Sequence, residues 1–151
     1  MSSGGASANR TGKMLEENIK GYLEQNYTAV NNKKFFESTH HGKNVYSKQV
    51  IVGKNIYGMD RKVDFILYHP VRWDKCLVIQ CKWQAIPGSV DEKYPFEVEC
   101  IRHGEYPTII VLDGAGYRPG AREWLMKQCD DKLLRVCTLG DFARLQGKGK
   151  V

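Results

Sequence analysis

Apolar side chains recur along the chain with two different spacings, one typical of helices and one typical of strands. Residues 12–25, GKMLEENIKGYLEQ, place apolar side chains three and four positions apart and predict a helix, with Thr11 as its N-cap. Residues 119–131, PGAREWLMKQCDD, predict a second amphipathic helix. Residues 89–104 also suggest a helix, but Pro95 is expected to disturb it.

Apolar, β-branched runs between these helices predict strands, and polar, turn-rich segments separate the runs. Val30 and the pair Phe35-Phe36 suggest a further extended region near the start. A connection over roughly residues 69–76 is short enough to make an antiparallel hairpin of the strands on either side. The predicted strands are 47–53, 62–69, 76–83, 106–114 and 133–139.

The order of these elements predicts the fold class. Helix, several strands, helix, strand, helix and strand is the order of an α/β three-layer sandwich, with helices on both faces of one sheet. A chain of 151 residues suits a single domain with one sizeable core, here residues 11–146. We expect residues 1–10 to form a disordered tail and residues 147–151 a mobile basic tail.

Charge and composition narrow the class of partner. The formal net charge is +6, which favours polyanions such as DNA, RNA or an acidic membrane surface. No apolar run approaches the roughly 20 residues of a membrane helix, and the N-terminus lacks the apolar stretch of a signal peptide. The five cysteines form no CxxC pair and are expected to be free thiols. A cytoplasmic protein without membrane contact is therefore the expectation.

The stretch LVIQCKWQ, residues 77–84, combines a buried strand with polar side chains that a core strand does not need. Gln80 and Lys82 lie two positions apart and therefore share one face of the strand. Asp64 lies in the preceding strand, and the hairpin register places it opposite Gln80 or Lys82. Opposed or diagonal side chains are about 4.5 to 8 Å apart, so we expect a carboxylate, an amide and an ammonium to converge.

Such a cluster needs a charged partner, and a hard divalent cation fits it. Mg²⁺ prefers oxygen ligands and often takes one or two carboxylates together with substrate phosphate and water. Asp64, the side-chain oxygen of Gln80 and the backbone carbonyl of Cys81 supply oxygens. Lys82 is suited to orient or help deprotonate an attacking water, or to stabilise charge on a phosphorane.

Asp64 followed by Gln80-x-Lys82 on the next strand resembles the PD-(D/E)XK nuclease superfamily, with VD for PD and QCK for (D/E)XK. The glutamine variant is similar to that of Mrr-type endonucleases, which act on modified DNA. The segment from Gly12 to Glu16 resembles the first-helix motif of the family and implies that Glu16 is a third metal-site carboxylate, with Glu17 as the alternative. The resemblance covers roughly residues 11–146 in an α-β-β-β-α-β order. Val63 and Gln80 depart from the usual proline and acid, and the second departure predicts low metal affinity without substrate.

The resemblance implies a restriction-endonuclease-like fold with a central mixed sheet and a Mg²⁺-dependent endonuclease, for which Mn²⁺ can substitute. DNA is the expected substrate, RNA is not excluded, and a homodimer is plausible because cutting both strands needs two sites. Restriction or defence, repair and recombination are the roles that the resemblance implies. The alternative is an inactive module of the same fold that binds nucleic acid or a protein.

Candidate contacts to nucleic acid surround the predicted site. Arg61 and Lys62 flank Asp64, Gln84 continues the face of Gln80 and Lys82, and Lys93 follows on the next helix. Lys43 belongs to a basic, loop-rich region before the hairpin. Contacts of this kind bind phosphates without reading bases. Four aromatic residues are interpreted as packing residues and not as platforms on which bases stack: Tyr57, Trp73, Trp83 and Trp124.

Overall fold

The computed structural model describes residues 4–84, 91–114 and 116–151, with side chains from residue 12 onward. Its helices are α1 (Gly4–Leu23), α2 (Phe35–Ser38), α3 (Tyr94–His103), α4 (Pro119–Lys127) and α5 (Leu139–Gly147). Its strands are β1 (Thr28–Ala29), β2 (Val45–Lys54), β3 (Asp60–His69), β4 (Trp73–Trp83), β5 (Thr108–Asp113) and β6 (Leu133–Cys137). Short 3-10 turns η1 (Asn32–Lys34), η2 (Thr39–His41) and η3 (Asp91–Lys93) complete the described elements.

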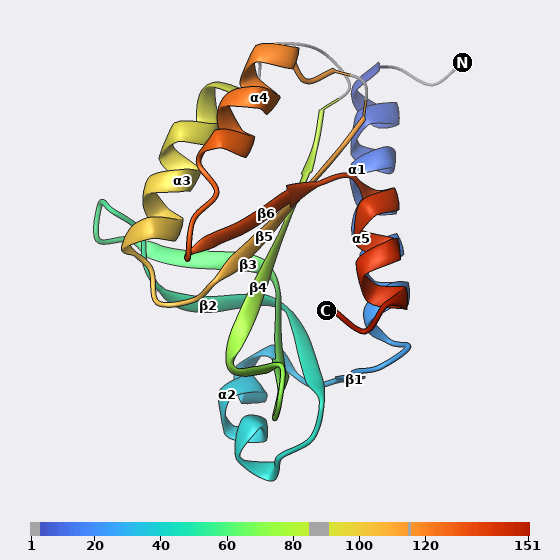
Figure 1. Cartoon of the computed structure of the whole chain (residues 1–151), viewed down its shortest axis with the longest axis vertical. Helices are drawn as coiled ribbons and strands as arrows, with labels where there is room; N and C mark the ends of the chain where they lie inside the picture. Colours follow the sequence, from blue (N-terminus) through green and yellow to red (C-terminus); the bar gives the residue numbers. More distant parts are fainter. Residues whose placement is uncertain (1–3, 85–90, 115) are drawn as a thin grey trace.

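The six described strands form one mixed sheet in the order β1-β2-β3-β4-β5-β6. Strands β2, β3 and β4 are antiparallel neighbours, whereas β4, β5 and β6 run parallel. Helices α3 and α4 make the two crossovers of the parallel half and lie on one face, while α1 and α5 lie on the other (Figure 1). Two crossovers that move in the same direction across a sheet share a face because both are right-handed. The predicted three-layer α/β/α sandwich is confirmed.

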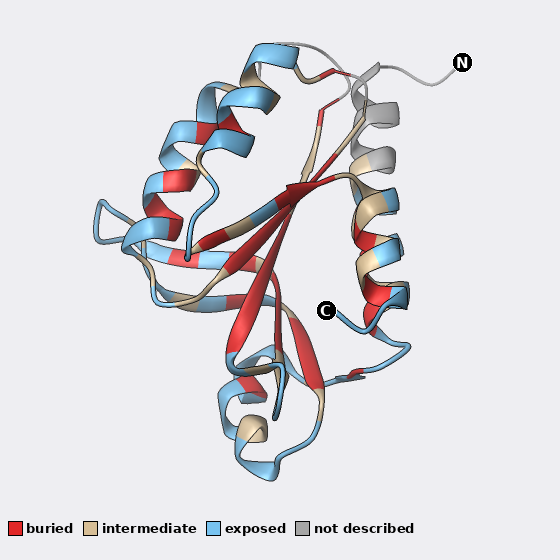
Figure 2. Ribbon diagram, viewed as in Figure 1, coloured by how far each residue is buried: buried red, intermediate tan, exposed pale blue. Residues whose placement is uncertain are grey.

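The core is divided by the sheet into layers, and the central parts of the strands between them are buried (Figure 2). Leu15, Ile19 and Leu23 of α1 pack on the same face as Phe65 and Ile79. On the α3 face lie the buried side chains of Tyr94, Val98, Ile101, Ile110 and Leu112. Strands covered on both sides read as continuous apolar runs, which explains why Cys76–Ile79 and Ile109–Leu112 are apolar without alternation.

Several predicted elements differ from those observed. The segment at Phe35 is a short helix after a 3-10 turn rather than a strand, because Asn31 accepts the N–H of Lys33 and starts a turn. Pro95 lies in the first turn of α3, where its missing N–H has no helical partner to lose, so it begins the helix and does not disturb it. Helix α4 ends at Lys127, short of residue 131.

The hairpin between β3 and β4 is tighter than predicted, since β4 begins at Trp73 and only residues 70–72 connect the strands. Two N–H groups, of Val71 and Arg72, donate to His69 Nδ1 and close this turn. The register then shifts by a bulge near Cys76, whose φ is +73°. Beyond the bulge Phe65 pairs with Ile79, a register that continues to Asp64 opposite Gln80.

The two predicted tails are more ordered than expected. Helix α1 already begins at Gly4, so residues 4–10 are helical, as proline-free segments with alanine can be; residues 1–3 lie outside the described residues. At the other end Val151 is only 1% exposed and packs in the core, and its carbonyl accepts a hydrogen bond from Arg72. The prediction of a mobile C-terminal tail is therefore wrong for Val151.

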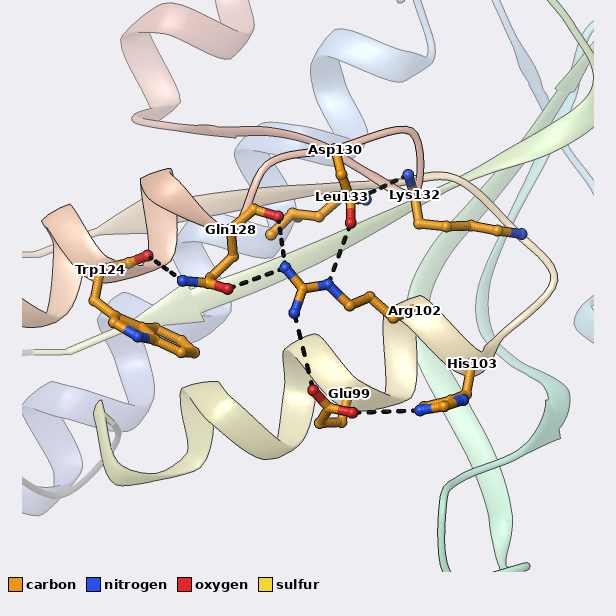
Figure 3. A network of polar contacts seen from close by, with 8 residues as sticks. All are labelled: Glu99, Arg102, His103, Trp124, Gln128, Asp130, Lys132 and Leu133. Carbon is orange, nitrogen blue, oxygen red and sulfur yellow. Dashed lines mark hydrogen bonds and ion pairs between the residues drawn. The ribbon is translucent and has the colours of Figure 1, made fainter.

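A network around Arg102 ties α3 to the end of α4 and the following turn (Figure 3). The guanidinium donates to the carboxylate of Asp130 and to both the backbone and side-chain oxygens of Gln128. Asp130 in turn accepts the N–H groups of Lys132 and Leu133 at the start of β6. The network links the C-terminal end of α3 to the turn that precedes β6.

No described helix combines the length and the hydropathy that crossing a membrane requires.

Candidate active site

The pairing of β3 and β4 ends at Phe65 and Ile79, and side chains take over the hydrogen bonds beyond that point. The backbone N–H of Asp64 donates to Gln80 Oε1 at 2.8 Å, and the N–H of Cys81 donates to Asp64 Oδ2 at 2.8 Å. Asp64 and Gln80 therefore stand in for the ladder where the two strands separate. Asp64 and Gln80 are thus in contact, as the pairing of Phe65 with Ile79 next to them requires.

Asp64 is a carboxylate held in a largely buried position. Burial raises its pKa, whereas the hydrogen bond from Cys81 and the charge of Lys82 lower it, and the charge of Glu97 raises it again. The net direction is upward, so the charged form lacks sufficient compensation from the protein alone. A cation at this carboxylate would supply that compensation.

The backbone of Cys81 points toward the same place. Along a strand the N–H and C=O of one residue point to the same side. Because the N–H of Cys81 reaches Asp64, its carbonyl also faces the β3 side, whereas Val78 N–H bonds to the β5 side at Pro107. The carbonyl oxygen of Cys81 is thus directed to the gap that holds the Asp64 carboxylate. The thiol of Cys81 packs on the α1 face instead.

Glu16 of α1 is a helix carboxylate whose charge interacts with that of Asp64. It follows Leu15, whose side chain is buried in the core, and it is half-buried, whereas Glu17 is exposed. Burial raises the pKa of Glu16, and the negative charge of Asp64 raises it further, against the opposing charge of Lys48. The charge of Asp64 therefore disfavours the charged form of Glu16, as a nearby carboxylate does. The structure favours Glu16 over Glu17.

These oxygens are too few for a metal site built from protein ligands alone, but Mg²⁺ needs only a few protein ligands. Among the described residues no group of three or more His, Cys, Asp or Glu side chains is arranged to hold a metal. Mg²⁺ usually retains waters and takes only one or two protein carboxylates, completing its shell with substrate phosphate. Two carboxylates, Asp64 and Glu16, with the Cys81 carbonyl match that pattern.

Gln80 is held at both ends of its amide. Its side chain is 5% exposed, its Oε1 accepts the Asp64 N–H, and its Nε2 donates to Glu97 Oε1 at 2.9 Å. The oxygen predicted as a metal ligand is already occupied on one lone pair by the backbone of Asp64. The amide orients Asp64 in this structure, which the sequence did not indicate.

Glu97 of α3 is a site residue that the sequence analysis missed. It accepts from Gln80 and faces the guanidinium of Arg61, with 3.7 Å between Glu97 Oε1 and Arg61 Nη2. A usable indication existed, because Glu97 lies three positions after Tyr94 and four before Ile101, which are both buried on the inner face of α3. An acid at such a position needs a buried partner.

The prediction that Arg61 and Gln84 contact nucleic acid is corrected, because both residues are buried. Arg61 is 8% exposed and pairs with Glu97 rather than facing solvent. Gln84 is 2% exposed and accepts a hydrogen bond from the Tyr94 hydroxyl. Its carbonyl lies 2.5 Å from the position of a Cβ on Gly114, which has φ of +94°, so only glycine fits there.

The remaining predicted lysines occupy different parts of the surface. Lys82 is half-buried and lines a hollow together with the exposed Lys93, so these two predicted site residues share one hollow. Lys62 lines a separate surface hollow beside Lys33 and Phe36. Lys43 precedes β2, whose first residue pairs with Tyr68 near the opposite end of the hairpin, which places it on the order of 20 Å from Lys82 along the strands.

The sequence was compared with known proteins. Residues 7–149 match the model of a family described as PD-(D/E)XK nuclease superfamily domain. No curated protein and no solved structure matched the sequence. The matched region includes Glu16, Asp64, Gln80 and Lys82 and extends over nearly the whole chain.

Proposed function

Because the chain belongs to the PD-(D/E)XK nuclease superfamily, we propose that it is a metal-dependent endonuclease that hydrolyses phosphodiester bonds in DNA. The observation that supports this function is the carboxylate of Asp64, which lies where β3 and β4 separate and accepts the Cys81 N–H. Glu16 and Lys82 interact electrostatically with that carboxylate. An acid pair that can bind a divalent ion beside a lysine that can act on a water suits hydrolysis of a phosphodiester.

Asp64, Glu16 and the carbonyl of Cys81 would hold the magnesium ion, or manganese in its place. The ion would supply charge stabilisation at the phosphate and a more acidic bound water. Gln80 positions Asp64 through its backbone N–H and retains one lone pair for a ligand role. Lys82 orients the attacking water on the α3 side of β4 and stabilises the negative charge that develops on the phosphorane.

Nucleic acid would approach over the side that carries Lys82 and Lys93. We propose Lys93 as a phosphate contact, with Lys62 as a more distant one and Lys43 only for a long substrate. A homodimer would bring two sites to a duplex, since each chain offers one. A DNA substrate and five free thiols in the described residues agree with a cytoplasmic location.

Cleavage of supercoiled plasmid and branched DNA in Mg²⁺ or Mn²⁺ tests the function. Asp64→Ala and Lys82→Ala should each lower the rate by about 100-fold or more, the usual effect of losing a charge-stabilising or acid–base group. Lys75→Ala is the matched control, because Lys75 is an exposed lysine of the same strand and should cleave like the wild type. Cleavage that survives both site substitutions would contradict the assignment.

A non-catalytic module is the second candidate, and the engaged amide of Gln80 is what favours it. A site whose glutamine is used to hold Asp64 and Glu97 has fewer negative ligands than the acid of the family motif would provide. If the wild type cuts neither DNA nor a matched RNA duplex while still binding nucleic acid, this reading replaces the nuclease. Preferential cutting of the RNA duplex would change the substrate class instead.

A further inference from the structure

The turn between β2 and β3 presents an exposed aromatic ring beside the candidate active site. Tyr57 is 74% exposed, which corrects its interpretation as a packing residue. Its ring stacks on Phe96 of α3 with 5.2 Å between centroids and an angle of 26° between planes. Figure 1 shows the turn projecting next to α3. A single exposed ring is common on protein surfaces, so the case for a binding role depends on what surrounds this one.

The turn that carries Tyr57 is well defined. Asn55 Oδ1 accepts the N–H groups of Tyr57 and Met59, and the backbone of Asn55 exchanges hydrogen bonds with Met59 and Gly58. Gly58 has φ of +77°, which a glycine adopts without strain. The ring is therefore presented by a rigid turn, and little conformational entropy would be lost when something stacks on it.

The ring pair and Lys82 belong to the same hollow. Tyr57, Phe96 and Tyr94 line it together with Lys82 and Lys93, around a volume of about 490 Å³. Whatever nucleic acid brings a phosphate to Lys82 would therefore bring its neighbouring base to the aromatic wall. The size falls within the ~300–1,000 Å³ of ordinary small-ligand pockets.

The charges of the hollow favour a base over a bare phosphate. Glu92 and Glu97 line it as well, so carboxylates lie beside the two lysines, and Glu97 also pairs with Arg61. A hollow with acids among its lysines and an aromatic wall suits a planar base next to a phosphate better than a bare phosphate, and a nucleobase stacks on tyrosine independently of its identity. A base inside a duplex has both faces covered by its neighbours, whereas an unpaired base beside the cut can offer a face.

We propose that this hollow binds one unpaired nucleobase of the strand being cut, stacked on Tyr57, with Lys93 on the adjoining phosphate. The substrate class is thus nucleic acid with unpaired nucleotides next to the cut, such as a single strand, a flap or a branch. The proposal rests on the proposed function, because it assumes that the scissile phosphate reaches Lys82.

A binding measurement without cleavage tests the site. Oligonucleotides with one 2-aminopurine, either unpaired in a flap or paired within a duplex, are titrated with protein in EDTA, and quenching of the 2-aminopurine fluorescence reports stacking. Wild type should quench the unpaired probe alone. Tyr57→Ala should raise the dissociation constant for that probe by about 5- to 150-fold. Tyr57→Phe keeps the ring and should change it less than twofold.

Met59→Ala is the matched control, because Met59 is an exposed residue of the same turn that does not line the hollow. Circular dichroism checks that each variant is folded. Equal quenching by wild type and Tyr57→Ala would overturn the proposal. A second contradictory outcome is a wild type that self-associates in sedimentation velocity, a Tyr57→Ala variant that does not, and equal quenching by both. The ring would then bind a second copy of the chain.

A parallel cleavage series separates this proposal from the proposed function. If the function holds, Asp64→Ala abolishes cutting of every substrate. If the base site holds as well, Tyr57→Ala slows cutting of the flap by the factor seen in binding and leaves the rate on a fully paired duplex unchanged. If the wild type cuts and Tyr57→Ala changes the rates on flap and duplex by the same factor, the proposed function stands and the base site is contradicted. Tyr57-dependent quenching without any cutting by wild type would lose the function and retain a base-binding hollow.

Discussion

Arg61 contacts helix α3 from β3 and Arg102 belongs to α3, but the first is buried with few partners and the second is exposed with many. The guanidinium of Arg102 bonds to Asp130 and Gln128, and its side chain is 36% exposed (Figure 3). The side chain of Arg61 is 9% exposed, and among the described residues its Nη2 has no hydrogen-bond partner and lies 3.7 Å from Glu97.

The difference indicates what each cluster is for. A surface network that satisfies its donors stabilises the packing of α3 at modest gain, because water competes with each contact. A buried pair with incomplete hydrogen bonding is a poor way to stabilise a fold. The Arg61 cluster continues through Glu97 and Gln80 to the backbone of Asp64, so its structural result is the position of the candidate catalytic carboxylate.

The largest expected effect of breaking this contrast comes from Glu97→Gln. The substitution leaves Arg61 buried without a countercharge, and we expect the free energy of unfolding to fall by about 3 kcal/mol, measured by urea denaturation. Glu99→Gln is the control, since Glu99 is an exposed residue of the same helix, and it should change stability by less than about 0.5 kcal/mol. Equal effects of the two substitutions would mean that the buried pair contributes nothing special.

Arg102→Ala should have a smaller effect on stability and none on catalysis. Its contacts are shared with solvent, so we expect a loss of about 1 kcal/mol in urea denaturation. The rate of DNA cleavage should stay within twofold of the wild type because the network does not reach Asp64. Lys127→Ala, at the last residue of α4, controls for the loss of a surface cation. A large loss of activity in Arg102→Ala would show that α3 is positioned for catalysis from this end.

The smallest effect is a pH-dependent gain in stability on Asp64→Asn. Burial raises the pKa of Asp64 above its unfolded value, so the folded protein binds the proton more tightly. The unfavourable charged form then lowers stability as pH rises through the interval above the unfolded pKa. Asp64→Asn should therefore melt slightly higher than wild type at pH 7 without divalent ions, and the difference should vanish below about pH 4.

Magnesium should reverse that difference. An ion bound by the carboxylate stabilises the folded wild type by mass action and leaves Asp64→Asn unchanged. Thermal melts at pH 7 with and without 10 mM Mg²⁺, about the concentration a weak site needs, provide the measurement. A rise in melting temperature that is equal in both proteins would place the ion elsewhere.

The sequence predicted most of the fold because its strands are covered on both faces and therefore read as long apolar runs. The resemblance around Asp64, Gln80 and Lys82 held over the whole sandwich, and the family match covers residues 7–149. The errors fall where local rules compete. Phe35 is apolar enough for a strand but follows an asparagine turn, and Pro95 reads as a helix breaker although it lies in a first turn.

The site was less predictable, because its geometry depends on contacts between distant elements. Strand alternation placed Gln80 and Lys82 on one face, but only the packing of α3 shows that Glu97 meets Gln80. Arg61 and Gln84 carry polar side chains whose burial has no local cause in the sequence. Tyr57 looked like a core residue by type, and only the turn geometry reveals its exposure. The roles of these residues in binding and catalysis stay predictions.

The sequential order of the strands has a consequence for how the chain folds. Strands β2, β3 and β4 are joined by short connections, whereas the pairing of β4 with β5 must wait for α3 to cross the sheet. Contacts between near neighbours form faster than distant ones. We expect the Asp64–Gln80 hairpin to gain amide protection before β5 and β6 in pulsed hydrogen exchange, and simultaneous protection would contradict this order. The carboxylate would then be bracketed by its own strands before Glu97 arrives, so late docking of α3 would act as the final assembly step of the candidate active site.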